Sequence, residues 1–212
     1  IVRAEKLLAP LLSARAGFVE KRFASIGPTI GKELRQKAWA ALLVALASIV
    51  AYIAWAFRRV SKPVVSWKYG VAAIVALVHD VSIPAGVFAF LGKWYGVEVD
   101  ALFITALLTI LGFSVHDTIV VFDRIRENLK KLKTPEIFET TVGRSIGETM
   151  TRSINTSLTV ILVLAAILIL GGETVKYFSL ALLVGVFFGT YSSIFIASPI
   201  LVIWQKLVKP NN

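Results

Sequence analysis

The 212-residue sequence contains no cysteine, and this absence excludes disulfide bonds, thiolate metal sites and cysteine catalysis. Charged residues are also scarce, at 17% against about 25% in an ordinary soluble domain. No phosphate-binding loop, dinucleotide fingerprint or His-Glu-x-x-His motif occurs, so we expect no ATP hydrolysis, enzymatic activity, cofactor or metal site. With 57% hydrophobic residues and a mean hydropathy of +0.77, a water-soluble fold is strongly disfavoured.

The hydrophobic residues are concentrated in five stretches, each about long enough to cross ~30 Å of hydrocarbon as a helix. These stretches are residues 38–57, 69–91, 101–122, 153–170 and 178–204. All five tryptophans lie within a few residues of a stretch end, which is typical of an interfacial aromatic belt. The sequence therefore predicts an all-α polytopic transmembrane helix bundle with five spans.

Lysine and arginine are unevenly distributed among the connections between these stretches. They gather in the segments 58–68 and 123–152, whereas 92–100 and 171–176 hold one each. The positive-inside rule then places the first two connections and the tail, residues 206–212, in the cytoplasm. Residues 1–37 are accordingly predicted to be the end of an external (periplasmic) domain. Residues 38–205 form the transmembrane domain, and the net charge of +10 suits anionic lipid better than nucleic acid.

The long connection between the third and fourth stretches is also patterned. Ile125, Leu129 and Leu132 have helical spacing, and Pro135 is expected in the first turn of a second helix. We therefore predict a cytoplasmic helical region over residues 123–151 that lies along the membrane surface, with a solvated linker as the alternative. The only methionine is Met150, so the sequence is expected to be a piece of a longer protein.

Two aspartates lie inside the hydrophobic stretches, Asp80 and Asp117, and each directly follows one of the only two histidines, His79 and His116. A charged carboxylate facing lipid costs at least about 2.5 kcal/mol, so both should face the bundle interior and have a partner or a proton. Such a group can take up and release a proton. The alternative is a permanently protonated carboxyl that only joins neighbouring helices.

Proline 84 follows Asp80 by four residues and cannot donate a backbone hydrogen bond to the carbonyl of residue 80. We predict a kink there, either a functional hinge or a simple packing feature. The last stretch contains a ladder of small residues at four-residue spacing: Gly185, Gly189, Ser193 and Ala197. Small residues allow close approach of helices, so this ladder predicts packing rather than chemistry.

The fourth stretch opens with a polar stripe on one helical face, formed by Arg152, Asn155, Thr156 and Thr159. Arg152 and Asp117 occupy comparable depths at the cytoplasmic ends of consecutive spans, so an ion pair between them is geometrically available. The alternative is that Arg152 extends to lipid headgroups.

Several motifs resemble the SecF protein-export membrane protein family, and they occur in order along nearly the whole chain. The most specific is Gly-Phe-Ser-Val-His-Asp-Thr-Ile-Val-Val-Phe-Asp-Arg-Ile-Arg-Glu-Asn at residues 112–128. The others are residues 26–34, 77–81, 152–159 and 178–193. On this resemblance the chain is similar to the last five spans of such a protein, with the end of its external domain.

The resemblance implies a multi-pass subunit of the SecDF complex, of the RND superfamily, in a bacterial or archaeal cell membrane. Such a subunit uses the proton or sodium motive force to promote translocation of unfolded preproteins through SecYEG. The implied partners are SecD, the SecYEG translocon, YajC and YidC. The implied proton path contains Asp117 and Arg152, together with an acid of the SecD half. We predict that Asp80 is a secondary member of this path and that Asn155 and Thr156, from the polar stripe, support it. His116 stands where a small polar residue is expected.

Two other functions remain open from the residues alone. The chain could belong to another RND-type exporter, whose cargo would be small molecules or lipids. It could also be a non-transporting scaffold of the translocon, in which the intramembrane polar residues only hold helices together.

Overall fold

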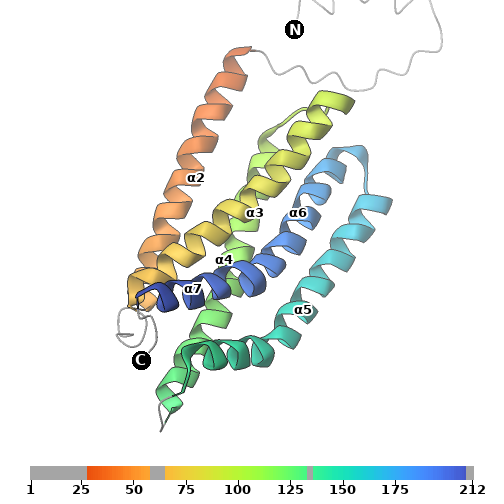
Figure 1. Ribbon diagram of the computed structural model, residues 1–212. Coiled ribbons are helices and arrows are strands. Elements are labelled where there is room, and N and C mark those ends of the chain that lie inside the picture. The colour runs from red at the N-terminus through yellow and green to blue at the C-terminus, as the bar shows by residue number, and fades with distance from the viewer. Residues whose placement is uncertain (1–27, 58–64, 133–135, 209–212) are drawn as a thin grey trace, which may run out of the picture. The chain divides into compact units, whose positions relative to one another are not determined.

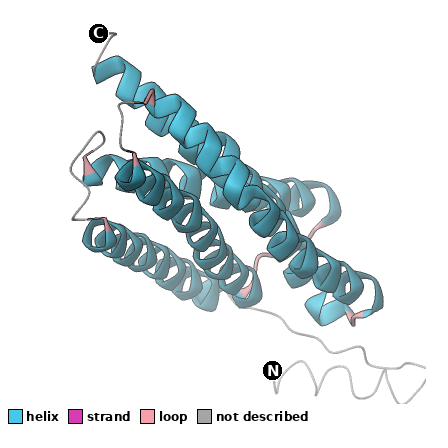
Figure 2. Cartoon of the chain, turned by 90° about the horizontal axis from the view of Figure 1, so that it is seen from below, coloured by secondary structure: helices cyan, strands magenta, loops and turns pink. Residues whose placement is uncertain are grey.

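The computed structural model describes residues 28–57, 65–132 and 136–208. Within these ranges the elements are all helical, and no strand occurs (Figures 1 and 2). The elements are α2 (Pro28–Ala56), α3 (Ser66–Tyr95), α4 (Ala101–Lys131), α5 (Phe138–Leu170), α6 (Glu173–Ser192), the π-helix η1 (Ser193–Ala197) and α7 (Ser198–Val208). Five helical stretches are long and apolar enough to cross a membrane, which confirms the predicted all-α polytopic bundle.

The chain divides into two compact units, residues 1–36 and 37–212, and the second contains most of α2 and all of α3 to α7. The predictions made for residues 1–27, 58–64, 133–135 and 209–212 lie outside the described residues. They include most of the external segment, the position of Pro135 and the end of the cytoplasmic tail.

Local sequence signals explain where several helices begin and end. Asp100 caps α4, because its side chain accepts a hydrogen bond of 2.9 Å from the backbone N–H of Phe103. Gly96 ends α3 in the left-handed conformation, with φ of 67°. Two glycines, Gly171 and Gly172, separate α5 from α6. The tight turns between these helices thus follow from the residues placed there.

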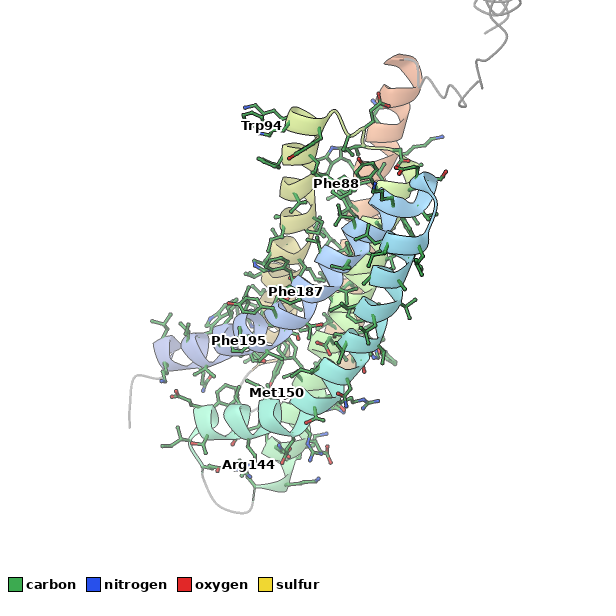
Figure 3. The ribbon with its side chains drawn as sticks, turned by 90° about the vertical axis from the view of Figure 1, so that its right-hand side faces the viewer. Phe88, Trp94, Arg144, Met150, Phe187 and Phe195 are labelled. Carbon is green, nitrogen blue, oxygen red and sulfur yellow. The ribbon has the colours of Figure 1, made fainter. Side chains whose placement is uncertain are left out.

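The charged connection after the third predicted span is built from the ends of two long helices. Helix α4 continues to Lys131 without a break, since no glycine or proline interrupts it beyond Gly112. Helix α5 begins at Phe138 and runs on through the fourth predicted span. Figure 3 shows that α5 turns close to Met150 and that Arg144 lies on the arm before the turn. The placement of this region along the membrane surface stays a prediction.

The last predicted span, 178–204, is not one regular helix as expected. A π-helical turn, Ser193–Ala197, separates α6 from α7, and the chain bends there (Figure 1). Pro199 lacks the N–H that would bond the carbonyl of residue 195. The hydroxyl of Ser198 donates to the carbonyl of Ser193 at 3.1 Å, five residues back. The proline and this hydroxyl together give a physical reason for the wider turn.

Two apolar cores hold the second unit together, and α6 packs against α3, α4 and α5. One core contains Phe88, visible in Figure 3, whose ring is tilted against that of Phe103 with the ring centroids 4.4 Å apart. The other contains Tyr69 and Phe122, and it is where Ile53 and Phe57 anchor the end of α2. The remaining members of the first core are Ala106, Leu107, Ile110, Leu164, Ala181, Leu182 and Val186. The remaining members of the second are Ala72, Ala73, Ala76, Val121, Ile125, Val142, Ala197 and Leu201.

Candidate functional site

A layer of polar residues, buried except for the half-buried Thr190, separates the two apolar cores. Along α3, α4, α5 and the α6–α7 segment, the polar residues fall in sequence between the members of one core and those of the other. We call this set the polar layer: Asp80, Ser114, Asp117, Ser153, Ser157, Thr190, Ser192 and Ser193. Both intramembrane acids therefore lie inside the bundle, as their sequence context predicted.

Asp80 is fully buried and its carboxylate is surrounded by donors from three helices. Ser114 on α4 donates to Oδ2, and Ser192 at the end of α6 donates to the same oxygen at 2.7 Å. The Nδ1 atom of His79 lies 2.9 Å from Oδ1. A buried carboxylate is tolerated only when its oxygens are hydrogen-bonded, and these three groups supply that requirement.

Asp117 is 7% exposed and is bound by two serines. Ser153 on α5 donates to Oδ1 at 2.5 Å, and Ser193 in the π-helix donates to Oδ2 at 2.7 Å. Its neighbour His116 is exposed and therefore faces away from the acid. The carboxylate thus ties three helical elements together through hydroxyl groups alone.

Two consecutive residues of the last helix donate hydrogen bonds to the two acids. Ser192 is the final residue of α6 and binds Asp80, whereas Ser193 is the first residue of the π-helix and binds Asp117. On a regular α-helix, neighbouring side chains are about 100° apart, so they point toward different helices. The irregular turn begins at this pair, where the segment contacts α3 and α4 together.

The predicted small-residue ladder lies where α6 approaches α4. A Cβ atom added at Gly185 would stand 2.2 Å from Cδ1 of Ile110, and one at Gly189 would stand 3.2 Å from Cβ of Ser114. The packing prediction is therefore supported at both glycines. Ser193 of the ladder is also a hydrogen-bond partner of Asp117, which the sequence analysis did not predict.

Gly185→Ala should lower the stability of the bundle, because the new methyl group overlaps three side-chain atoms of Ile110. We expect a loss of about 1–3 kcal/mol in the free energy of unfolding, relative to the control Gly112→Ala. Gly112 lies on α4 and an added Cβ there meets no atom within 4 Å. Denaturant unfolding in detergent measures both variants.

The Ile110→Val substitution removes the atom that the new methyl group approaches most closely. Combined with Gly185→Ala, it should therefore restore part of the lost stability. Equal stability of Gly185→Ala and Gly112→Ala would contradict the close approach of the two helices.

The predicted polar stripe of α5 does not face the polar layer. Arg152, Asn155, Thr156 and Thr159 are all exposed, whereas Ser153 and Ser157 are buried. Ser157 pairs with Thr190 and so extends the layer toward α6. The interior face of α5 is therefore the serine face, and the stripe lies on the outside of this chain.

The guanidinium of Arg152 has no hydrogen-bond or ion-pair partner among the described residues, so the ion pair with Asp117 is not formed in this structure. Arg152 instead lines a cavity of about 530 Å³ where α2, α4 and α5 meet. The other residues lining the cavity are Tyr52, Trp55, Ala56, Phe57, Ile119, Val120, Asp123, Arg124, Arg126, Glu127 and Thr149. Because Ser153 is the next residue, the backbone of Arg152 still lies beside a contact of Asp117.

A cluster of ion pairs and hydrogen bonds joins α4 to α5 beyond the polar layer. Arg124 bonds Glu127 at 2.6 Å on its own helix and Glu148 at 2.5 Å on α5. The amide of Asn128 donates to Glu148 at 2.8 Å and to Ser145 at 3.0 Å. The Asp-Arg-Ile-Arg-Glu-Asn run thus fixes the ends of two helices whose central parts carry the acid site.

Pro84 is buried within α3, and the helix continues through it from Ser66 to Tyr95. Its position is four residues beyond the buried acid, as the sequence indicated. The hinge function of Pro84 stays a prediction.

The serines of the polar layer were the part of the site that the sequence analysis missed. Ser114 and Ser153 stand inside the motifs that carried the family resemblance, and the adjacent pair Ser192–Ser193 closes the last motif. A signal was available in their spacing: Ser114 precedes Asp117 by three residues, on the same face of α4. Which serine meets which acid depends on helix packing.

Comparisons with known proteins agree along nearly the whole chain. Residues 9–207 match the family described as "Protein export membrane protein SecD/SecF, C-terminal". The protein translocase subunit SecF of Thermobaculum terrenum is 53% identical over 200 residues, which cover 94% of this chain and 62% of that protein. The protein translocase subunit SecDF of Thermus thermophilus is 43% identical, with 94% of this chain and 27% of that protein covered.

The fold is also that of a solved relative. The crystal structure of SecDF, a translocon-associated membrane protein from Thermus thermophilus, superposes with a TM-score of 0.78 at 42% identity. That match covers 97% of this chain and 26% of the other. The chain therefore spans about three fifths of the length of a separate SecF subunit, and about a quarter of a fused SecDF protein.

Proposed function

Since the chain belongs to the SecD/SecF C-terminal family of protein-export membrane proteins, we propose that it promotes preprotein translocation by coupling it to an ion gradient. The gradient is the proton motive force or its sodium counterpart. The cargo is an unfolded preprotein that passes through SecYEG, and the pull acts on the external side.

The observation that carries this proposal is the pair of buried carboxylates in the polar layer. Each acid is held by serine hydroxyls and has no ion-pair partner of fixed charge among the described residues. A hydroxyl can donate to a carboxylate or accept from a protonated carboxyl, so such a site tolerates both protonation states. A site built to hold a permanent charge would be expected to pair it with lysine or arginine.

The proposed functions of the individual residues are those that the sequence predicted. Asp117 carries the coupling ion and Arg152 is its switchable partner, which moves between the cavity and the acid during the cycle. Asp80 is a secondary acid, and Pro84 allows α3 to bend beside it. Asn155 and Thr156, on the exposed stripe of α5, line the path that the ion follows to reach Asp117.

We place the chain in the cell membrane with its C-terminus in the cytoplasm and residues 1–37 outside, from the distribution of lysine and arginine. The proposed partners are SecD, as a separate protein or a fused half, and the SecYEG translocon. YajC and YidC are further candidates. The exposed apolar faces of α2 and α5 provide surface for lipid and for the SecD half.

The test is preprotein translocation in vesicles that contain SecYEG, SecD and the complete protein. An imposed proton or sodium gradient should increase translocation only when the protein is present, and an ionophore for the coupling ion should remove the increase. Repeating the measurement with each ion separately identifies the one that is used.

The alternative functions predict different results in the same vesicles. A scaffold would increase translocation to the same extent with and without a gradient. An exporter of small molecules or lipids would leave preprotein translocation unchanged in both conditions. Either result would overturn the proposal.

A further inference from the structure

Each of the two adjacent serines has two acceptors within reach. The hydroxyl of Ser192 lies 2.7 Å from Oδ2 of Asp80 and 3.1 Å from the carbonyl of Gly189. The hydroxyl of Ser193 lies 2.7 Å from Oδ2 of Asp117 and 2.9 Å from the carbonyl of Thr190. A hydroxyl has one hydrogen, so each serine can donate to its acid or to its own helix, but not fully to both.

The two acceptors match the two protonation states of an aspartate. When the acid is a carboxylate, the serine donates to it. When the acid takes up a proton, the new carboxyl O–H donates to the serine oxygen, and the serine hydrogen turns to the helix carbonyl. The serine keeps its own proton throughout, and neither the serine hydroxyl nor the acid oxygen that it contacts loses its partner in either state.

The two serine hydroxyls, each with its two alternative acceptors, are connected because their residues are consecutive in the chain. Ser192 and Ser193 are neighbours, and so are the carbonyls of Gly189 and Thr190 that serve as their second acceptors. A rotation of the last turn of α6 that shortens one serine–acid distance must therefore change the other. Helix α4 adds a second connection, since Ser114 binds Asp80 one turn before Asp117.

We infer that Ser192 and Ser193 are positioning residues that join Asp80 and Asp117 into one coupled pair, in which the protonation of either acid changes the proton affinity of the other. This inference rests on the proposed ion-coupled function and extends it. Asp80, secondary in that proposal, becomes the second member of the carrier site.

Few other charged groups face the pair. Between residues 69 and 92, 101 and 122, 153 and 170, and 177 and 205, the only Asp, Glu, Lys, Arg or His residues are His79, Asp80, His116 and Asp117. The tyrosines in these ranges, Tyr69, Tyr177 and Tyr191, lie in the described part of the chain and form no hydrogen bond with either acid. His79 contacts Asp80, His116 is exposed, and Arg152 stands just before Ser153. Direct attraction or repulsion by further charges of this chain therefore contributes little to the coupling.

The experiment is an infrared titration of the carboxyl bands of the complete protein in lipid nanodiscs, with the bands assigned by Asp→Asn variants. In the parent protein, Asp80→Asn should shift the titration midpoint of Asp117 by about one pH unit. In the Ser192→Ala/Ser193→Ala background, the same substitution should shift it by no more than about a third of that amount. The control Ser179→Ala removes a buried hydroxyl from the same helix that binds neither acid, and should keep the full shift.

No shift in the parent protein, or an equal shift with and without the two serines, would overturn the inference. If the double variant does not fold, Ser193→Ala alone is used, and it should still reduce the shift. Gradient-driven translocation, measured separately, distinguishes a failure of the coupling from a failure of the proposed function. A normal gradient response without coupled titration midpoints would exclude only the coupling of the two acids. A missing gradient response would exclude the proposed function itself.

Discussion

Asp117→Asn should reduce gradient-stimulated translocation to the level of vesicles without the protein. Asparagine has nearly the same shape but cannot take up or release a proton. Its side-chain oxygen can still accept one serine hydroxyl, and Ser193 can donate to the carbonyl of Thr190 at 2.9 Å. We therefore expect the free energy of unfolding to change by no more than about 1 kcal/mol, so that function is lost without loss of the fold.

The matched control for this variant is Asp123→Asn, six residues further along the same helix. The side chain of Asp123 is 55% exposed and pairs with Arg126 at 2.7 Å. Exposed pairs of this kind contribute little to stability, so this control should translocate normally. Gradient-stimulated translocation that persists in Asp117→Asn would remove this acid from the mechanism.

Arg152→Met should abolish gradient-stimulated translocation while leaving the bundle folded. The side chain is exposed, so its removal breaks no buried contact. A guanidinium that moves to about 4 Å from Asp117 would favour the ionised acid by roughly 4 kcal/mol at an effective dielectric constant of about 20. In the proposed cycle, the charged state of Asp117 then lacks its stabilising cation when the ion must leave.

Two further variants separate this function of Arg152 from an interaction with lipid headgroups. Arg152→Lys keeps the charge but loses the planar, bidentate geometry, so partial translocation is expected. Arg144→Met removes another arginine of α5, one that pairs with Glu136, and should have little effect on translocation. If Arg152 only extends to headgroups, Arg152→Lys will be normal and Arg152→Met only mildly impaired.

The acids could be found from the sequence because a charge within a long apolar stretch is exceptional. The five spans could be predicted equally well, since the length and composition of a span depend on local sequence alone. The serines could not be identified as partners of the acids in this way, because serine is common in apolar helices. Which residue a serine contacts depends on how each helix is rotated about its axis. Ser153 and Arg152 are adjacent, yet one is buried against Asp117 and the other lies outside.

The polar stripe of α5 shows why a search for polar side chains at helical spacing identified the exposed face of this helix instead of the buried one. Arg152, Asn155 and Thr156 are more polar or larger than the serines, and hence more conspicuous in a helical pattern. The interior beside Asp117, however, is where helices approach closely, and only small side chains fit there. The π-helix was missed for a related reason: Pro199 was present in the sequence, but a one-residue irregularity leaves the hydrophobic pattern almost unchanged.

The polar layer also has a mechanical consequence for the bundle. Two of the helical segments that cross it are irregular: α5 turns near Met150, and the last helix widens at Ser193 (Figures 1 and 3). Helices α3 and α4 run through it as continuous α-helices. The two apolar cores on either side of the layer are tightly packed and resist deformation. Any bending of the bundle is therefore expected at the polar layer, where these two irregular turns lie, rather than within either apolar core.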